Sequence, residues 1–160
     1  LQRKPCRPVC IRVIREVLYF KPKGIATNIP RALNFLNSVT TRRAVAFLVS
    51  DFMAEDYEVP LRIANRRHDV IAVSVTDPRE ETLPDVGLIA VRDTESGRET
   101  LVDTGNAGVR MQYERVAVER AKKRDQTFQR TKVDAINVRT DKPYATEIYR
   151  FFRMREKRYA

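Results

Sequence analysis

The chain has 160 residues, of which 42% are hydrophobic, and its 31 lysines and arginines outnumber its 21 aspartates and glutamates. This composition describes one globular domain with a core of its own, and it excludes a disordered or low-complexity chain. The longest apolar run, Ala44 to Val49, is far shorter than the roughly 18 residues of a membrane-spanning helix, so we expect no membrane span in this chain. The net charge of +10 permits an acidic partner without identifying it.

Two amphipathic helices are predicted before the first strand. Residues 9 to 20 carry apolar side chains at spacings of three and four, and Lys21-Pro22-Lys23-Gly24 ends that helix. The same spacing resumes at Ile29, with Thr27 or Asn28 as the expected N-cap.

A parallel sheet is predicted from the next segments. Residues 44 to 50 are apolar at consecutive positions, which is typical of a strand covered on both faces. A helix within about 55 to 67 and a second apolar run, 69 to 75, complete a strand-helix-strand unit. Because such crossovers are right-handed and favour parallel pairing, the predicted fold is a three-layer α/β sandwich.

The second half of the chain adds a hairpin, a long helix, a third core strand and a last helix. Residues 88–93 and 98–103 alternate around a Gly-ended connection, which predicts an antiparallel hairpin. A helix with a narrow buried stripe follows over about 109 to 130, and then a strand over 133 to 138. Asp141 can cap the last helix, with Pro143 in its first turn. The expected inner face of this helix consists of Tyr144, Ile148, Phe151 and Phe152.

Catalytic patterns are sparse. The single histidine, His68, ends a predicted helix, where a capping role beside two arginines is favoured over catalysis. No serine lies in a G-x-S-x-G elbow and no Gly-rich phosphate loop is present. Cys6 and Cys10 lack the further ligands that a structural zinc site needs, and so few cysteines fit a reducing compartment. We therefore assign no catalytic residue and expect no enzymatic activity.

The candidate binding residues are Ser50 and Asp51, which follow the first central strand. In open α/β sheets the binding crevice lies beyond the carboxyl ends of the strands. Thr27 can approach the same edge, and a hydroxyl beside a carboxylate suits Mg²⁺. Two ligands make an incomplete metal site, and the alternative is that Asp51 and Thr27 cap the helices that follow them.

Basic residues are dense within 120–130 and 139–158, where a nucleic-acid interface would use them as phosphate contacts. Acidic residues interrupt both segments, which favours a solvated helical face over a specific nucleic-acid surface. The interrupting residues are Asp125, Glu147 and Glu156, with Glu114 and Glu119 just before the first segment.

Several short runs form a pattern that extends through most of the chain. They are Val49-Ser50-Asp51-Phe52, Arg67 to Val73, Asp77-Pro78-Arg79-Glu80, Leu83-Pro84-Asp85-Val86-Gly87-Leu88, Asp93 to Gly97, Val102-Asp103-Thr104, Thr140-Asp141 with Tyr144, and Phe151-Phe152-Arg153. Together they resemble the bacterial Domain of Unknown Function 58 family, whose C-terminal part looks like a von Willebrand factor A domain. The D-P-R-E and L-P-D-x-G-L runs are the most specific of them.

The resemblance implies a doubly wound, mainly parallel sheet with a metal-ion-dependent adhesion site. In such domains the site is built from a D-x-S-x-S loop, a Thr loop and an Asp loop, and Thr27 and Asp51 match the last two. The first loop and its strand would precede Leu1. We therefore expect residues 1–160 to be a single domain and a fragment of a longer protein that lacks the first strand of the A-type fold, and Mg²⁺ to bind only if the missing loop is supplied.

The resemblance also implies a partner, because family members are often encoded beside MoxR-type AAA+ ATPases and carry upstream transmembrane segments. We expect a cytoplasmic protein-interaction or adaptor domain that acts at the cytoplasmic face of the membrane, with nucleic-acid binding through the basic C-terminal helices as the alternative. A magnesium-dependent hydrolase at Asp51 would need a nucleophile-activating group that the sequence does not provide. The edge of strand 44–50 would neighbour the missing strand, and its open hydrogen-bonding groups predict a homo-oligomer.

Overall fold

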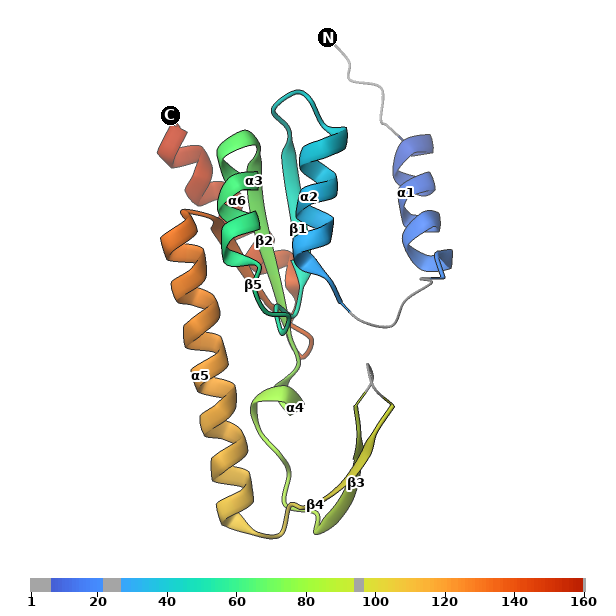
Figure 1. Cartoon of the computed structure of the whole chain (residues 1–160), viewed down its shortest axis with the longest axis vertical. Coiled ribbons are helices and arrows are strands. Elements are labelled where there is room, and N and C mark those ends of the chain that lie inside the picture. Colours follow the sequence, from blue (N-terminus) through green and yellow to red (C-terminus); the bar gives the residue numbers. More distant parts are fainter. Residues whose placement is uncertain (1–6, 22–26, 94–96, 160) are drawn as a thin grey trace.

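The computed structural model describes residues 7–21, 27–93 and 97–159 (Figure 1). Its elements are α1 (Arg7–Tyr19), α2 (Ile29–Val39), β1 (Val45–Ser50), α3 (Glu58–Arg67), β2 (Asp69–Thr76), α4 (Pro78–Glu81), β3 (Leu88–Arg92), β4 (Glu99–Asp103), α5 (Ala107–Thr131), β5 (Asp134–Arg139) and α6 (Tyr144–Tyr159). Within these described ranges, no helix has the length and apolar character needed to cross a membrane.

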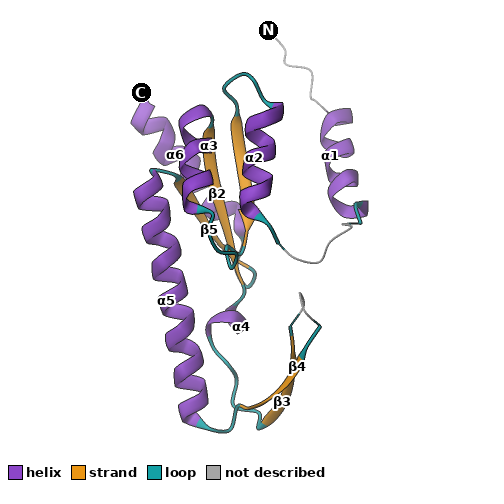
Figure 2. Ribbon diagram, viewed as in Figure 1, coloured by secondary structure: helices purple, strands orange, loops and turns teal. Residues whose placement is uncertain are grey.

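The protein has a mixed α/β fold with two separate sheets. The strands β1, β2 and β5 form a parallel sheet in the order β1-β2-β5, with Val45 opposite Asp69 and Ile71 opposite Asp134. The strands β3 and β4 form a separate antiparallel pair. The expected parallel sheet and hairpin are thus confirmed. Figure 2 shows α2 and α3 on one face of the parallel sheet and α6 on the other.

The alternation of side chains along β2 creates two cores, one on each face of the sheet. Val70 and Ala72 belong to the larger core, which contains residues of α2, α3, α5 and the loop after β1. Ile71 points to the opposite face, where it packs in the smaller core with Ile136 of β5 and Phe151 of α6. Since β2 is covered on both faces, its continuous apolar run is explained.

The expectation that β1 is covered on both faces is wrong. Ala46 and Leu48 pack against the larger core, whereas Val45, Phe47 and Val49 on the other face are 59%, 51% and 62% exposed. The reason is that α6 packs mainly over β5 and reaches β1 only at its margin, where the Phe47 and Phe152 rings lie 6.3 Å apart. One face of the edge strand therefore remains open.

Local capping interactions determine where the helices begin, and only some of them agree with the prediction from the sequence. Asn28 is the N-cap of α2, because its side chain accepts a hydrogen bond from the Arg31 backbone N–H at 2.8 Å. The short helix α4 was not predicted, although Asp77 and Glu80 form a capping box around it. Asp141 does not cap α6, since its carboxylate pairs with Arg139 and the helix begins one residue after Pro143. Of the expected inner face, Tyr144 and Phe152 are exposed.

The hairpin and the N-terminal half of α5 extend away from the parallel sheet (Figure 1). The base of the hairpin is fixed by Thr104, a fully buried residue whose hydroxyl donates to the Gly87 carbonyl at 2.6 Å and accepts from the Val86 N–H at 3.2 Å. Arg110 of α5 donates to the Thr104 carbonyl and pairs with Asp85 at 3.1 Å. The hairpin is therefore tied to α5 rather than to the sheet.

Candidate functional site

A cleft of about 480 Å³ lies beyond the carboxyl ends of β1 and β2. It is enclosed by the loop between β1 and α3, by α4 and by the middle of α5. Its lining combines apolar and aromatic residues with charged residues of both signs. They include Phe52, Met53, Tyr57, Ala117, Val118 and Ala121; Asp51, Glu55, Asp56, Glu58, Glu80, Glu81 and Glu114; and Arg120, Lys123 and Arg124.

The loop that begins the cleft is shaped by the side chains of Ser50 and Asp51. The Ser50 hydroxyl accepts from the Phe52 N–H at 3.1 Å and donates to Asp51 Oδ1 at 3.3 Å. Asp51 Oδ1 also accepts from the Met53 N–H at 3.0 Å. Asp51 thus closes a tight turn two residues long and does not cap α3, which begins at Glu58.

Phe52 anchors this loop in the larger core. Its backbone φ is 58°, a left-handed conformation that costs a non-glycine residue on the order of 1 kcal/mol. The ring is only 6% exposed, and its centroid lies 4.9 Å from that of Phe128 and 5.6 Å from that of Tyr57. Burying an aromatic ring stabilises by more than this strain costs. The loop therefore holds its acidic residues in a defined place.

Tyr57 forms part of the apolar floor of the cleft. Its side chain is largely buried, and the loss of hydration raises the pKa of the phenol above its ordinary value of 10.0. The neutral ring is therefore the form present at pH 7, and it packs beneath the cleft as part of the larger core.

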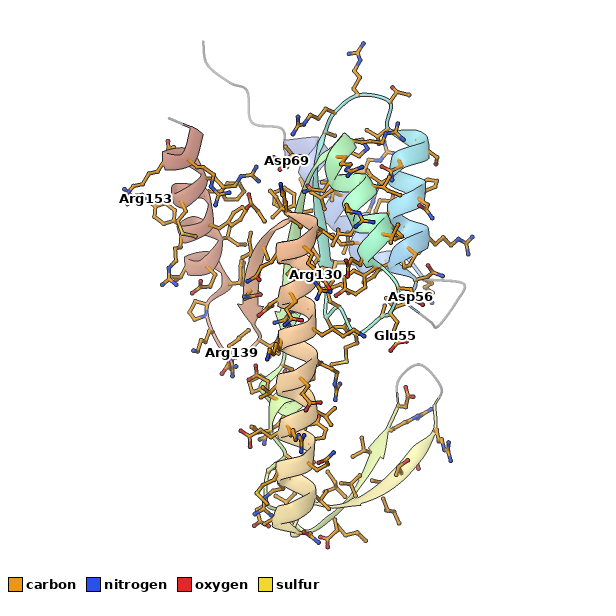
Figure 3. All side chains as sticks on the ribbon, turned by 60° about the vertical axis from the view of Figure 1, so that its left-hand side comes forward. Glu55, Asp56, Asp69, Arg130, Arg139 and Arg153 are labelled. Carbon is orange, nitrogen blue, oxygen red and sulfur yellow. The ribbon has the colours of Figure 1, made fainter. Side chains whose placement is uncertain are left out.

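Two charged walls face the cleft without neutralising each other. Glu55 and Asp56 lie side by side on the loop before α3 (Figure 3), while Arg120 and Lys123 project from α5. None of these four residues forms an ion pair within the described part of the chain. The walls do contact each other through Arg120 Nη1, which lies 3.8 Å from the Met53 sulfur. The cleft thus offers unpaired charges of both signs around an apolar floor.

A second polar cluster joins the carboxyl ends of β2 and β5 beside the cleft. The Thr140 hydroxyl donates to Asp77 Oδ2 at 2.6 Å, and this bond, together with the Arg79 N–H, lowers the pKa of the Asp77 carboxyl. Arg139 pairs with Asp141 at 3.1 Å and with Glu81, which lowers the pKa of Asp141 and raises that of the guanidinium. These contacts pair the charged groups of the cluster with one another. The cluster therefore holds the ends of β2 and β5 together and leaves few charges for a ligand.

Of the two residues predicted for metal binding, only Asp51 lines the described cleft. Asp51 lines the cleft, whereas Thr27 is an exposed residue before α2 and is not among the lining residues. Within the described ranges, no group of three or more His, Cys, Asp or Glu side chains is arranged to hold a metal ion. The proposed role of Thr27 as a helix cap is wrong, because Asn28 holds that position.

The remaining candidates lie away from the cleft. His68 occupies the C-cap position of α3, where its N–H donates to the Ala64 carbonyl at 2.8 Å. Its side chain is 1% exposed, and neither ring nitrogen has a hydrogen-bond partner among the described residues. Cys6 lies outside the described residues, and Cys10 falls within α1.

Many basic residues of the C-terminal segments have acidic partners. Arg155 bonds Asp69 at 2.7 and 2.9 Å and lies 3.5 Å from Asp134, which also pairs with Arg158 at 3.0 Å. Arg150 pairs with Glu147 at 3.3 Å. These pairs reduce the positive charge that α6 presents, in keeping with a solvated helical face.

Sequence reasoning missed the wall of the cleft that α5 supplies. Arg120 and Lys123 are three residues apart and therefore share one side of a helix, where Ala117 and Ala121 are their neighbours. This pattern of small and basic residues on one side of a helix is a signal from which a binding surface on α5 can be predicted. Its position opposite the loop after β1 depends on the packing of Phe128 against Phe52.

Comparison with known proteins places this architecture among relatives of unassigned function. An uncharacterized protein of Mycobacterium tuberculosis strain H37Rv and one of Mycobacterium bovis are each 32% identical over 137 residues, which cover 85% of this chain and 43% of theirs. An uncharacterized Mycobacterium avium protein is 30% identical over 137 residues, with 85% and 80% covered. The chain thus spans less than half the length of the M. tuberculosis and M. bovis proteins.

One solved structure and one family also match. The crystal structure of the conserved hypothetical protein BatB from Bacteroides thetaiotaomicron aligns with a TM-score of 0.43 and 16% identity, covering 95% of this chain and 70% of that one. Residues 3–124 match the family described as "Protein of unknown function DUF58". This match covers most of the chain, and the resemblance inferred from the D-P-R-E and L-P-D-x-G-L runs is confirmed. The chain belongs to the DUF58 family.

Proposed function

We propose that this chain is a non-enzymatic protein-interaction or adaptor domain of a bacterial von Willebrand factor A-like protein, and that a partner protein binds in the cleft after β1. The observation that carries the proposal is the cleft itself, with an apolar and aromatic floor between acidic and basic walls that do not neutralise each other. Apolar surface supplies affinity, and unpaired charges at a rim orient the partner and exclude wrong ones.

The chemistry of the cleft favours a polypeptide ligand. A partner segment that carries both acidic and basic side chains can pair with Arg120 and Lys123 on one wall and with Glu55 and Asp56 on the other. Its apolar residues can contact Met53 and Val118, which line the cleft and are 47% and 60% exposed. A ligand with charge of a single sign would leave one wall unpaired. Solvent-exposed ion pairs contribute roughly 0.2–1 kcal/mol each, so several are needed for selectivity.

The partner that we propose is a MoxR-type AAA+ ATPase at the cytoplasmic face of the membrane, an assignment supported by the family resemblance. The test is a pull-down of a longer version of this protein with such an ATPase, with and without Mg²⁺. Arg120→Glu and Glu55→Lys reverse one charge on each wall and should weaken capture about tenfold. Arg62→Glu is the matched control, because Arg62 is exposed on α3 and does not line the cleft. No capture under either condition would refute the ATPase partner.

For Mg²⁺ we propose that Thr27 and Asp51 contribute to a site only when a further ligand loop is supplied. Two protein ligands give too little charge to offset dehydration of the ion, so the 160-residue chain should bind Mg²⁺ weakly or not at all. Isothermal calorimetry measures this directly. Submillimolar affinity that is lost in Asp51→Ala would contradict the proposal.

Nucleic-acid binding through the basic C-terminal helices is the rival function. It predicts a gel shift at low salt that weakens steeply as salt is added and after charge reversal at Arg150, Arg153 and Arg155. The carboxylate partners of Arg150 and Arg155 count against it. A shift that follows this pattern would nevertheless favour it over protein binding.

A further inference from the structure

One contact crosses the cleft between its two walls. Arg120 Nη1 of α5 lies 3.8 Å from the sulfur of Met53, which belongs to the loop after β1. The helix α5 packs against α3 and α4, and α4 directly follows β2, so the contact lies toward the interior of the sheet. A thioether sulfur is a weak hydrogen-bond acceptor. The contact therefore places the guanidinium across the cleft without holding it firmly.

The structure fixes the position of Met53 and leaves its side chain accessible. The Met53 N–H donates to Asp51 Oδ1 at 3.0 Å, and the preceding Phe52 ring is anchored in the larger core. Met53 itself is 47% exposed and lines the cleft. A small oxidant can therefore reach the sulfur while Arg120 stays beside it.

We propose that Met53 is an oxidation site that regulates the cleft, an inference that rests on the partner binding proposed for that cleft. The oxidant is a hydroperoxide, of which hydrogen peroxide is the simplest. The sulfur lone pair attacks one peroxide oxygen, and an S–O bond forms as the O–O bond breaks. The departing oxygen takes the proton of the attacked oxygen and leaves as water. The thioether is thereby oxidised to the sulfoxide while the peroxide is reduced.

The sulfoxide converts the weak contact with Arg120 into a strong one. The added oxygen carries partial negative charge, and the 3.8 Å between sulfur and Nη1 leaves room for it to accept a hydrogen bond of about 2.9 Å. Hydrogen bonds with a charged donor are roughly twice as strong as neutral ones. Arg120 is then held across the cleft and withdrawn from a carboxylate of the partner, and the apolar contact offered by Met53 becomes polar.

The other two methionines of the chain, Met111 and Met154, supply matched controls. They are 65% and 54% exposed, so peroxide oxidises them as well, but neither lines the cleft. Their oxidation should therefore affect neither Arg120 nor the capture of a partner.

The contact is tested on the 160-residue chain without a partner. Exchange of the guanidinium N–H groups is followed by NMR before and after treatment with hydrogen peroxide, with the Arg120 signal assigned from Arg120→Lys. Oxidation should slow the exchange of Arg120 about tenfold in the parent chain and in the double variant Met111→Leu, Met154→Leu. It should leave the exchange unchanged in Met53→Leu, which keeps the volume and lacks the sulfur. Unchanged exchange in the oxidised parent chain, or slowed exchange in Met53→Leu, would overturn the proposal.

Partner capture tests the regulation. In the pull-down with the AAA+ ATPase, oxidation should weaken capture by the parent protein about tenfold, and methionine sulfoxide reductases should restore it. Capture by Met53→Leu should not respond to peroxide. Slowed exchange of Arg120 with unaltered capture would refute regulation of the cleft. Failure of the ATPase to bind in either redox state would instead refute the proposed partner, because the exchange measurement decides the contact between Met53 and Arg120 on its own.

Discussion

The contact between Arg155 and the first residues of β2 and β5 makes the clearest stability prediction. The guanidinium donates two hydrogen bonds to Asp69, at 2.7 and 2.9 Å, and lies 3.5 Å from Asp134, with 12% of the arginine side chain exposed. It also lies 5.6 Å from the centre of the Phe151 ring. One residue of α6 thus neutralises carboxylates on two neighbouring strands.

Replacing this arginine with methionine keeps the apolar stem and removes the charge. Hydrogen bonds to charged groups contribute about 1.5–3 kcal/mol, whereas breaking a fully buried pair costs about 3–5 kcal/mol. Asp69 and Asp134 are 30% and 27% exposed, so water partly compensates them. We therefore expect Arg155→Met to lower the free energy of unfolding by about 2–3 kcal/mol.

Urea denaturation at pH 7 measures this loss, and Arg153→Met supplies the matched control. Arg153 is on the same helix, is exposed and interacts with the Tyr149 ring at 5.8 Å, so its loss should cost less than about 1 kcal/mol. Arg155→Lys should fall between the two variants, because a lysine keeps the charge but has a single nitrogen, whereas Arg155 faces Asp69 with Nη2 and Asp134 with Nε. Equal losses for Arg155→Met and Arg153→Met would refute the reasoning.

Three further predictions concern acid, alkali and the buried histidine. Folding lowers the pKa of Asp77, so the stabilisation of the fold by its ionised carboxylate is complete above the ordinary pKa of 3.8 and is lost as the pH falls through the folded pKa. Thr140→Val should reduce this acid sensitivity of the unfolding free energy in pH-dependent urea titrations. Folding raises the pKa of Tyr57, so the stabilisation of the fold by its neutral phenol is complete below pH 10.0 and is lost as the pH rises through the folded pKa. Tyr57→Phe should therefore unfold less readily than the parent protein in alkali. His68→Leu should be neutral or stabilising in thermal unfolding because the ring nitrogens have no partners, whereas His68→Ala should cost about 2–4 kcal/mol by leaving a cavity.

The order and type of most elements could be predicted because their signals are local. The apolar run of β2 and the two runs of the hairpin depend only on neighbouring residues, and the predicted strands are confirmed, whereas residues 94–96 of the connection lie outside the described part of the chain. The helix α4 has such a signal as well, since Asp77 and Glu80 have capping-box spacing with a proline between them.

Whether a strand is covered depends on elements that lie far away in sequence. An apolar run such as that of β1 is compatible with burial on both faces, yet α6 crosses the sheet nearer β5 and leaves Phe47 half open. The cleft illustrates the same limit. Asp51 was predicted from its position at the end of a strand, whereas Arg120 on the facing wall is brought close only by the packing of α5 on the loop.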